Sequence, residues 1–194
     1  MARKESLYIQ REITEDFTSY PTVHYHRILD SGKAQGASPY DCYAIRCSSF
    51  GVSCQFYSME LKFWTYKQAF PFRKIEAHQI EAAWEVSQKG GRGFFLLCHR
   101  VYDRHAREYN PNYLVCVPVE VLDHWKNHCG QKSIRLQDAP EVLRFYPEVR
   151  RRSTGAAKMY WNPGMLLDHL DWIYERRNSA EFFWKEDKNE SKNN

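Results

Sequence analysis

The sequence has no apolar run long enough to cross a membrane, no signal peptide and no Cys-x-x-Cys pair. A helix that spans a bilayer needs about 20 mostly apolar residues, so we expect no membrane partner. Several of the six cysteines lie in apolar, strand-like runs, where a free cysteine acts as a small hydrophobic residue. The six cysteines of the chain are Cys42, Cys47, Cys54, Cys98, Cys116 and Cys129. Together these features favour a reducing, cytoplasmic location.

A complete zinc-binding pattern is also missing. His124 and His128 are four residues apart, beside Cys129, on an expected helix. Structural zinc sites use four such ligands, and no second pair with suitable spacing occurs. The sequence also contains no internal repeat. It therefore predicts neither a structural zinc module nor a repeat architecture.

The net charge is small, +4, but the basic residues are clustered. The chain has 194 residues, of which 43% are hydrophobic and 15% aromatic, and this composition excludes a largely disordered protein. Clusters of basic residues indicate either a polyanionic partner or a solvated surface of mixed charge. The clusters are Arg73 and Lys74, then Arg92, Arg100, Arg104 and Arg107, then Arg150, Arg151 and Arg152.

The pattern of apolar residues predicts an α/β protein with a central mixed β-sheet flanked by helices. A helix over 74–89, stopped by Gly90-Gly91, separates the third and fourth strands, which should therefore be parallel. Loops are expected at 30–39 and 103–112. The other expected elements are helices at 4–18, 119–128 and 163–177 and strands at 23–29, 41–47, 54–62, 93–102 and 113–119.

Glu60 and Lys62 are two residues apart on the third strand, so their side chains share one face. A carboxylate can hold a divalent metal there, and the ammonium group can steady an attacking water or a developing negative charge. If Phe50-Gly51 is a two-residue hairpin loop, counting outward from Ser49 and Val52 pairs Asp41 with Glu60. Opposed side chains point to the same face. A bulge or one-residue slip would turn one carboxylate away.

Pro39-Tyr40-Asp41 followed by Glu60-Leu61-Lys62 resembles the motif of the PD-(D/E)XK nuclease superfamily. The continuation through FPF and the helix IEAHQIEAAWEV is similar, more narrowly, to RecU-type Holliday-junction resolvases and their phage relatives. The resemblance covers about residues 5–128. It implies a restriction-endonuclease-like core over 1–130 in a protein of bacterial, phage or mobile-element origin.

The resemblance also implies a Mg²⁺- or Mn²⁺-dependent endodeoxyribonuclease that leaves a 5′-phosphate. Asp41 and Glu60 would ligate the metal, with the Leu61 carbonyl as a possible third ligand, and Lys62 would orient or activate the water. Gln79 would hold water or phosphate nearby. Glu12 would complete the metal site through water, and Glu15 is the alternative for that role.

The resemblance implies DNA as partner, most readily a four-way or other branched junction, and a homodimer, because two strands are cut symmetrically. Restriction, repair or phage genome-processing enzymes of this fold, or a non-cleaving binding module, are the alternatives. RecU-type chains place an acid nearer the turn, where this chain has Ser48-Ser49; we prefer Asp41, which follows the proline. Candidate DNA-binding residues are Lys67, Arg73, Lys74, Arg150, Arg151 and Arg152.

The sequence after residue 130 matches no pattern that we can name. A C-terminal helical extension over 131–184 is expected, which either packs on the core or forms a dimer contact. The apolar side of its helix would consist of Met165, Leu166, Leu170, Ile173 and Tyr174. Residues 185–194 are expected to be a disordered tail.

Overall fold

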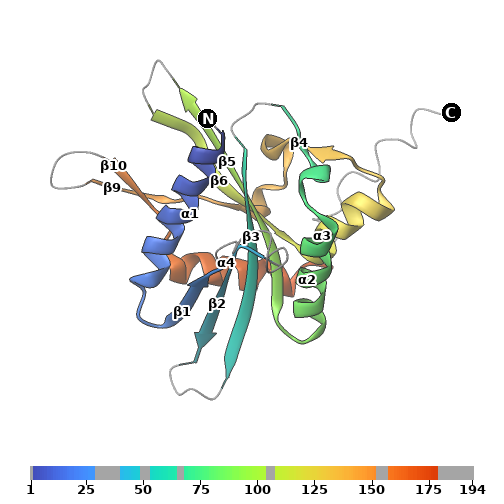
Figure 1. Ribbon diagram of the computed structural model, residues 1–194, viewed down its shortest axis with the longest axis horizontal. Helices are drawn as coiled ribbons and strands as arrows, with labels where there is room; N and C mark the ends of the chain where they lie inside the picture. The colour runs from blue at the N-terminus through green and yellow to red at the C-terminus, as the bar shows by residue number, and fades with distance from the viewer. Residues whose placement is uncertain are drawn as a thin grey trace, which may run out of the picture.

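The structure is a computed structural model that describes residues 2–28, 40–48, 53–64, 68–103, 108–151 and 157–178. Within these ranges, only the backbone is described for residues 2–9, 102, 103, 108–111, 149–151 and 157–159. The main helices are α1 (Ala2–Thr18), α2 (Ala77–Gln88), α3 (Val119–Asp123) and α4 (Pro163–Glu175) (Figure 1). The strands are β1 (Val23–Arg27), β2 (Cys42–Cys47), β3 (Cys54–Trp64), β4 (Phe70–Pro71), β5 (Arg92–Asp103), β6 (Glu108–Pro118), β7 (Ser133–Ile134), β8 (Arg144–Phe145), β9 (Glu148–Arg151) and β10 (Ala157–Tyr160).

The central sheet has six strands in the order β1-β2-β3-β5-β6-β8. Strands β3 and β5 are parallel and the other neighbouring pairs are antiparallel. A parallel pair needs a long connection, and α2 lies within it, as the sequence predicted. The α/β class and the mixed sheet flanked by helices are therefore confirmed. The two short sheets pair β9 with β10 and β4 with β7.

Helices cover both faces of this sheet. On β3, Tyr57, Met59 and Leu61 alternate with Ser58 and Glu60, so the two sets lie on opposite faces. The Tyr57 face carries α4, because the Tyr57 hydroxyl donates to Asp171 of α4 at 2.6 Å. The Tyr57 face also carries α1, whose Phe17 packs on Tyr25 of β1, with ring centroids 4.9 Å apart. The Glu60 face carries α2.

Helix α4 belongs to the main hydrophobic core. Leu166, Leu167, Leu170 and Ile173 are each 0% exposed and lie in the same core cluster as the sheet residues. Asp171 of α4 also forms ion pairs with Arg46 of β2 and Arg92 of β5.

The expected apolar side of this helix was wrong at Met165, which is 55% exposed. Leu167 occupies the buried position instead. The apolar side of α4 is buried against the core of its own chain, so it offers little surface for a dimer contact.

The other differences concern the ends of elements. The segment 103–112 was expected to be a loop, but β5 continues to Asp103 and β6 starts at Glu108, because the backbone pairing extends as far as Asp103 and Glu108. The helix expected at 119–128 ends as one π-helical turn, His124–His128. The C-terminal extension is not purely helical, because it adds β8 to the main sheet. In the part of the chain that the structure describes, no helix is long and apolar enough to cross a membrane.

Candidate active site

Asp41 and Glu60 meet at the end of the β2–β3 hairpin. The pairing of Cys42 with Met59, and of Cys47 with Cys54, has the register that the sequence predicted for Asp41 and Glu60. The backbone N–H of Asp41 donates to Glu60 Oε2 at 3.1 Å, and Asp41 Oδ2 accepts from the backbone N–H of Leu61 at 2.9 Å. Each carboxylate is thus held by the backbone of the other strand. The turn itself, 49–52, lies outside the described residues.

Glu60 is the centre of a cluster that also includes Lys62 and Gln79. Lys62 Nζ lies 2.7 Å from Glu60 Oε1, and Gln79 Nε2 donates to the same oxygen at 2.6 Å. Gln79 comes from the first turn of α2, where its Oε1 accepts from the backbone N–H of Glu76 at 3.1 Å. One side chain therefore caps the helix and holds Glu60. The structure brings together all four residues predicted as catalytic.

The surroundings of Glu60 favour the protonated form of its carboxyl group. Its residue is only 3% exposed. Burial, and then the nearby charge of Asp41, raise the pKa of Glu60 to about 7, although Lys62 opposes this shift. Two carboxylates in one site repel each other unless a cation compensates them. Perturbed acids of this kind are common at functional sites.

The donor set suits a hard divalent cation that keeps part of its water shell. Asp41 and Glu60 provide carboxylate oxygens, which Mg²⁺ prefers. The N–H and C=O of one strand residue point to the same side, so the Leu61 carbonyl projects toward Asp41, as a third ligand requires. Among the residues that the structure describes, no group of three or more His, Cys, Asp or Glu side chains could hold a metal. A closed protein-only cage is thus not formed there, and water or substrate oxygens would complete the coordination.

The structure places Glu12 away from this cluster. Glu12 Oε2 accepts from Arg100 Nη1 at 3.1 Å, and both residues are buried. Arg100 shares a face with Cys98, which pairs with Phe63, and that is the face opposite Glu60. Burial raises the pKa of Glu12 against the opposing charge of Arg100. The structure therefore does not bring Glu12 into the Asp41–Glu60 cluster, because α1 packs on the other face, and its role in completing the metal site stays a prediction.

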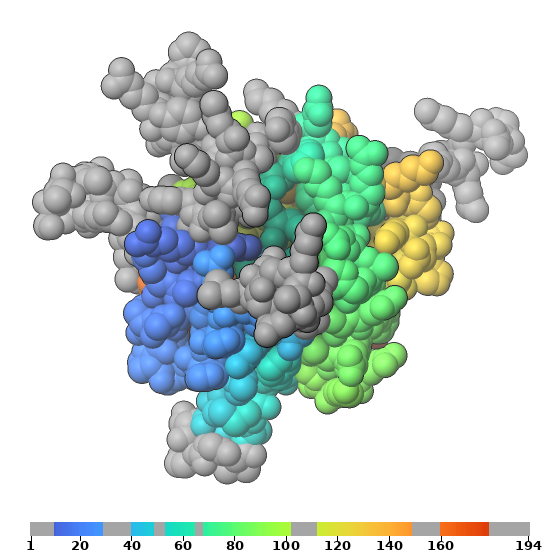
Figure 2. Space-filling model, viewed as in Figure 1, coloured from blue at the N-terminus to red at the C-terminus, as the bar shows by residue number. Residues whose placement is uncertain are grey.

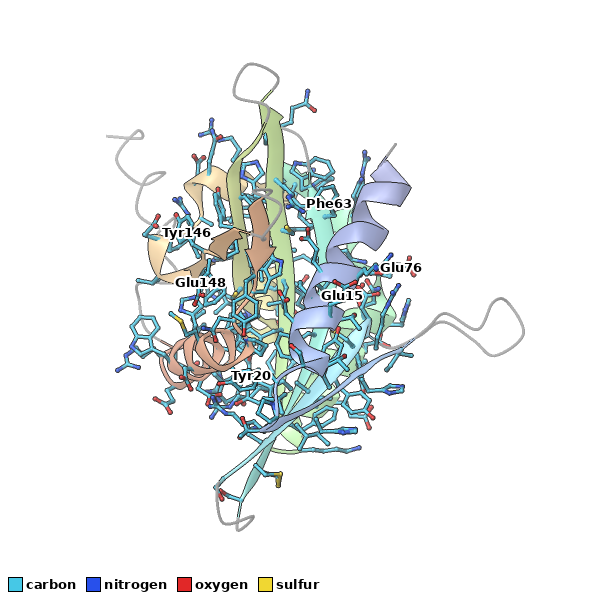
Figure 3. All side chains as sticks on the ribbon, turned by 90° about the vertical axis from the view of Figure 1, so that its left-hand side faces the viewer. Glu15, Tyr20, Phe63, Glu76, Tyr146 and Glu148 are labelled. Carbon is cyan, nitrogen blue, oxygen red and sulfur yellow. A yellow bond between two sulfur atoms is a disulfide. The ribbon has the colours of Figure 1, made fainter. Side chains whose placement is uncertain are left out.

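Glu15, the alternative to Glu12, lies on the exposed side of α1 (Figure 3). Its carboxylate pairs with Arg11 at 2.8 Å on the surface. The structure therefore does not bring Glu15 into the Asp41–Glu60 cluster either. His124 and His128 stack with ring centroids 5.3 Å apart, but among the described residues they belong to no group of three or more His, Cys, Asp or Glu side chains that could hold a metal.

Two of the residues predicted to bind DNA lie just beyond β3 in the sequence. Lys74 Nζ lies over the Trp64 ring, 4.6 Å from its centroid, and Trp64 shares the face of Glu60 and Lys62. Arg73 is exposed and lines a cavity of about 680 Å³ together with Lys126 and Lys132. The described residues that line this cavity carry three positive charges and no negative one. Stacking of Phe72 on Trp125, at 6.5 Å between ring centroids, joins the two sides of the cavity.

The other predicted DNA contacts cannot be placed. Lys67 and Arg152 lie outside the described residues, and so does the tail 185–194, which was expected to be disordered. Arg150 and Arg151 belong to β9, but their side chains lie outside the description.

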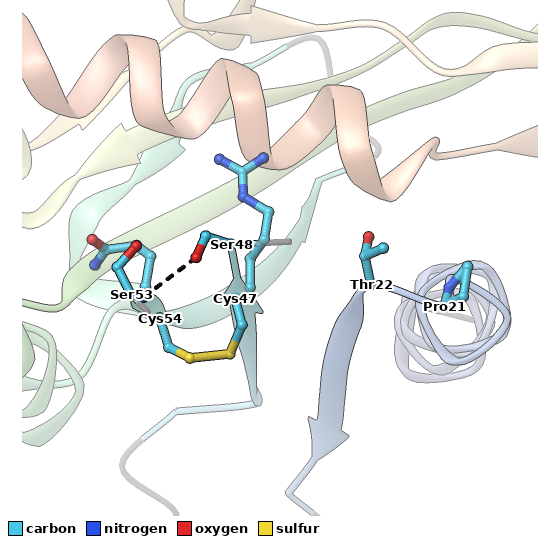
Figure 4. A pocket seen from close by; sticks show the side chains of 8 residues that line it. Pro21, Thr22, Cys47, Ser48, Ser53 and Cys54 are labelled. Carbon is cyan, nitrogen blue, oxygen red and sulfur yellow. Dashed lines mark hydrogen bonds between the residues drawn. A yellow bond between two sulfur atoms is a disulfide. The ribbon is translucent and has the colours of Figure 1, made fainter. Parts of the chain in front are cut away.

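A disulfide joins Cys47 and Cys54, a pairing that was not predicted from the sequence. The hairpin register that pairs Asp41 with Glu60 also places these cysteines opposite each other, so the signal was present. Cys42, Cys98 and Cys116 are buried thiols as expected. The disulfide borders another cavity of about 680 Å³, in which Ser53 N–H donates to Ser48 Oγ at 3.3 Å (Figure 4). None of the predicted site residues lines this cavity.

Comparison with models of known protein families gives no match, and comparison with curated proteins gives none either.

Proposed function

We propose that this protein is a metal-dependent endonuclease that hydrolyses phosphodiester bonds in DNA at the Asp41–Glu60 cluster. The observation that carries the proposal is the convergence of Asp41, Glu60, Lys62 and Gln79 from three separate elements. Two acids, a lysine and an amide at one point are more than packing requires. Burial, and then the charge of Asp41, raise the pKa of Glu60, so holding the two acids together costs stability that a functional site explains.

Asp41 and Glu60 are the residues that would hold Mg²⁺ or Mn²⁺. Such an ion, when bound, would lower the pKa of a bound water and neutralise charge on the phosphate. Lys62 Nζ can position the attacking water and hydrogen-bond a non-bridging phosphate oxygen as negative charge develops. Gln79 orients Glu60 through its amide. Attack of water on phosphorus and cleavage of the bond to O3′ leave a 3′-hydroxyl and a 5′-phosphate.

The basic residues extend the proposed DNA contact beyond the cluster. Lys74 lies on Trp64, two residues beyond Lys62 on the same face of β3. Arg73, Lys126 and Lys132 then surround the positively charged cavity. Phosphate contacts of this kind give affinity and register but little sequence preference. We therefore assign this cavity to the DNA backbone on one side of the cut.

The DNA substrate follows from the resemblance, which favours a four-way junction and a homodimer acting in recombination or repair. The test is to incubate the protein with a labelled junction, a matched duplex and a single strand, each with Mg²⁺, Mn²⁺ or EDTA. Metal-dependent cutting selective for the junction is expected. Equal cutting of duplex would indicate a restriction, repair or phage genome-processing enzyme. Tight binding without cutting in any metal would overturn the nuclease proposal in favour of a binding module.

A further inference from the structure

A cavity beside the candidate active site is walled by aromatic rings. It has a volume of about 400 Å³ and lies between the β2–β3 hairpin and α2. Figure 2 shows the cyan surface of β2 and β3 bordering the green surface of α2. Its lining residues are Tyr40, Phe56, Ala82, Glu85, Val86, Lys89 and Gly91. Tyr40 directly precedes Asp41, so one lining residue of the cavity adjoins the Asp41–Glu60 cluster in the sequence.

The rings are held by one another and remain partly exposed. Tyr40 meets Phe56 edge to face, with centroids 6.4 Å apart and planes at 71°. Phe56 stacks on Tyr43 at 5.5 Å and 25°, and Tyr43 packs on His26 at 5.3 Å. All four residues are half-buried or exposed. A core cluster of this size would be fully buried, whereas each residue of this one keeps some exposure to solvent.

The cavity lined by Tyr40 and Phe56 carries a different charge from the positively charged cavity lined by Arg73, Lys126 and Lys132. Glu85 and Lys89 pair with each other at 2.5 Å, so the charged groups of the lining cancel. A phosphate has no excess positive charge to bind here. An uncharged, flat, aromatic group fits better, with the Glu85 carboxylate as an acceptor and the Lys89 ammonium as a donor at the rim.

The position of the cavity suits a nucleotide that adjoins the reacting phosphate. Phe56 and Glu60 are four residues apart on one face of β3, a separation of about 13 Å at roughly 3.3 Å per residue. Tyr40 lies just before β2, and its ring centroid is 6.4 Å from that of Phe56. A base inside a duplex cannot reach a pocket in the protein, whereas an unpaired base can turn out of the stack and lie against aromatic side chains.

We propose that the Tyr40–Phe56 cavity binds one unpaired base of the DNA, adjacent to the phosphate at Asp41 and Glu60. This inference rests on the proposed nuclease function and makes it more specific: the enzyme acts where a base is free, as at a branch point. Phe56 and Tyr40 provide the stacking surface. Gly91 keeps the cavity open beside Phe56, because a Cβ there would lie 3.4 Å from the Phe56 ring and 2.6 Å from Val86 Cγ1.

The test measures binding rather than cleavage. Fluorescence anisotropy in EDTA gives the affinity of the full chain for a labelled four-way junction, with single abasic sites placed in turn at each nucleotide near the branch. One position should lose about 10-fold in affinity, the effect of one base–aromatic stack. Tyr40→Ala and Phe56→Leu should each lose a similar factor on intact DNA and show no further loss with the abasic strand. Trp172→Ala, which removes a partly exposed ring from α4 on the other face, is the control and should behave like wild type.

Circular dichroism establishes that each variant is folded, and Phe56→Leu retains apolar packing. If the wild type binds and cuts DNA but no abasic position weakens binding, the base-binding inference fails and the nuclease proposal survives. The base-binding inference also fails, and the nuclease proposal survives, if the abasic site weakens binding by both variants as much as by the wild type. The outcome is the same if the substitutions change only the oligomeric state of the protein. If the wild type binds no DNA at all, both proposals fail.

Discussion

The backbone N–H of Asp41 donates to the Glu60 carboxylate at 3.1 Å, while the Asp41 carboxylate accepts from the backbone N–H of Leu61 at 2.9 Å. This reciprocal pair fixes two acids at the open end of a hairpin. Each acid is thereby positioned by main chain, and Glu60 also accepts from the Gln79 side chain. The cost is electrostatic, because the pKa of Glu60 rises to about 7 through burial and the charge of Asp41.

The first prediction concerns pH and metal-free stability. The pKa of Glu60 is raised from its ordinary value of 4.5, so its contribution to stability is fully present below pH 4.5 and is lost as pH rises through about 7. In EDTA, Glu60→Gln should therefore become more stable than wild type between pH 5 and 8, by about 3 kcal/mol at most. Urea unfolding at several pH values measures the difference in unfolding free energy between Glu60→Gln and wild type. A difference that does not change with pH would contradict the raised pKa of Glu60. Mg²⁺ should stabilise the wild type most at the alkaline end.

The second prediction separates the two roles of Gln79. Gln79→Glu retains an oxygen that can accept from Glu76 N–H, so the helix cap should survive. Repulsion between the added carboxylate and Glu60 should lower the unfolding free energy by about 1.4 kcal/mol for each unit by which the pKa of Glu60 rises. The added carboxylate should raise the pKa of Glu60 further and shift the pH–rate profile for DNA cleavage to higher pH. At pH 7 we expect a loss of about 10-fold in rate, since one pKa unit corresponds to one factor of ten. Gln88→Glu, on an exposed position of the same helix, should leave the profile in place.

The third prediction concerns the Cys47–Cys54 disulfide. It closes a short loop, with a sequence separation of seven, and such a cross-link stabilises by about 2.5 kcal/mol in the chain-entropy description. Reduction, or replacement of both cysteines by serine, should lower the unfolding free energy by about this amount. Cys129→Ser, which changes a free thiol, is the matched control. Thiol titration of the denatured protein should find four free cysteines, and six would contradict the pairing.

The fourth prediction addresses the positively charged cavity. Arg73→Ala, Lys126→Ala and Lys132→Ala should each weaken DNA binding to a similar extent for all sequences. Each should also reduce the slope of log affinity against log salt concentration by about one. Arg11→Ala removes an exposed, ion-paired arginine from α1 and should leave the slope unchanged. If the slope of log affinity against log salt concentration is the same in all four variants, the cavity does not contact the DNA.

Much of the candidate site follows from local pattern. Alternation on β3 places Glu60 and Lys62 on one face, and the hairpin count places Asp41 opposite Glu60, because strand pairing has a fixed period of two. The helix 74–89 between two apolar strands similarly requires β3 and β5 to be parallel. These inferences need only the geometry of neighbouring segments.

The features that sequence could not provide depend on long-range packing. Periodicity shows that α1 has an apolar side, but not which face of the sheet it covers. The resemblance implies that Glu12 joins the metal site, whereas α1 lies on the face opposite Glu60. The polar residues 108–112 carry no strand pattern, yet they pair with β5 because main-chain hydrogen bonds do not need apolar side chains. The cavity between Tyr40 and Phe56 likewise exists only once α2 is docked on β3.

The most direct test of the account is the rate of junction cleavage in Mg²⁺ by wild type, Asp41→Asn, Glu60→Gln and Lys62→Ala, measured under single turnover. Glu81→Gln, an exposed acid on α2, is the control for loss of one carboxylate. The account predicts a loss of at least about 100-fold in each of the three site variants, with junction affinity largely retained and Glu81→Gln unaffected. Cleavage by Glu60→Gln and Lys62→Ala at the wild-type rate would contradict it.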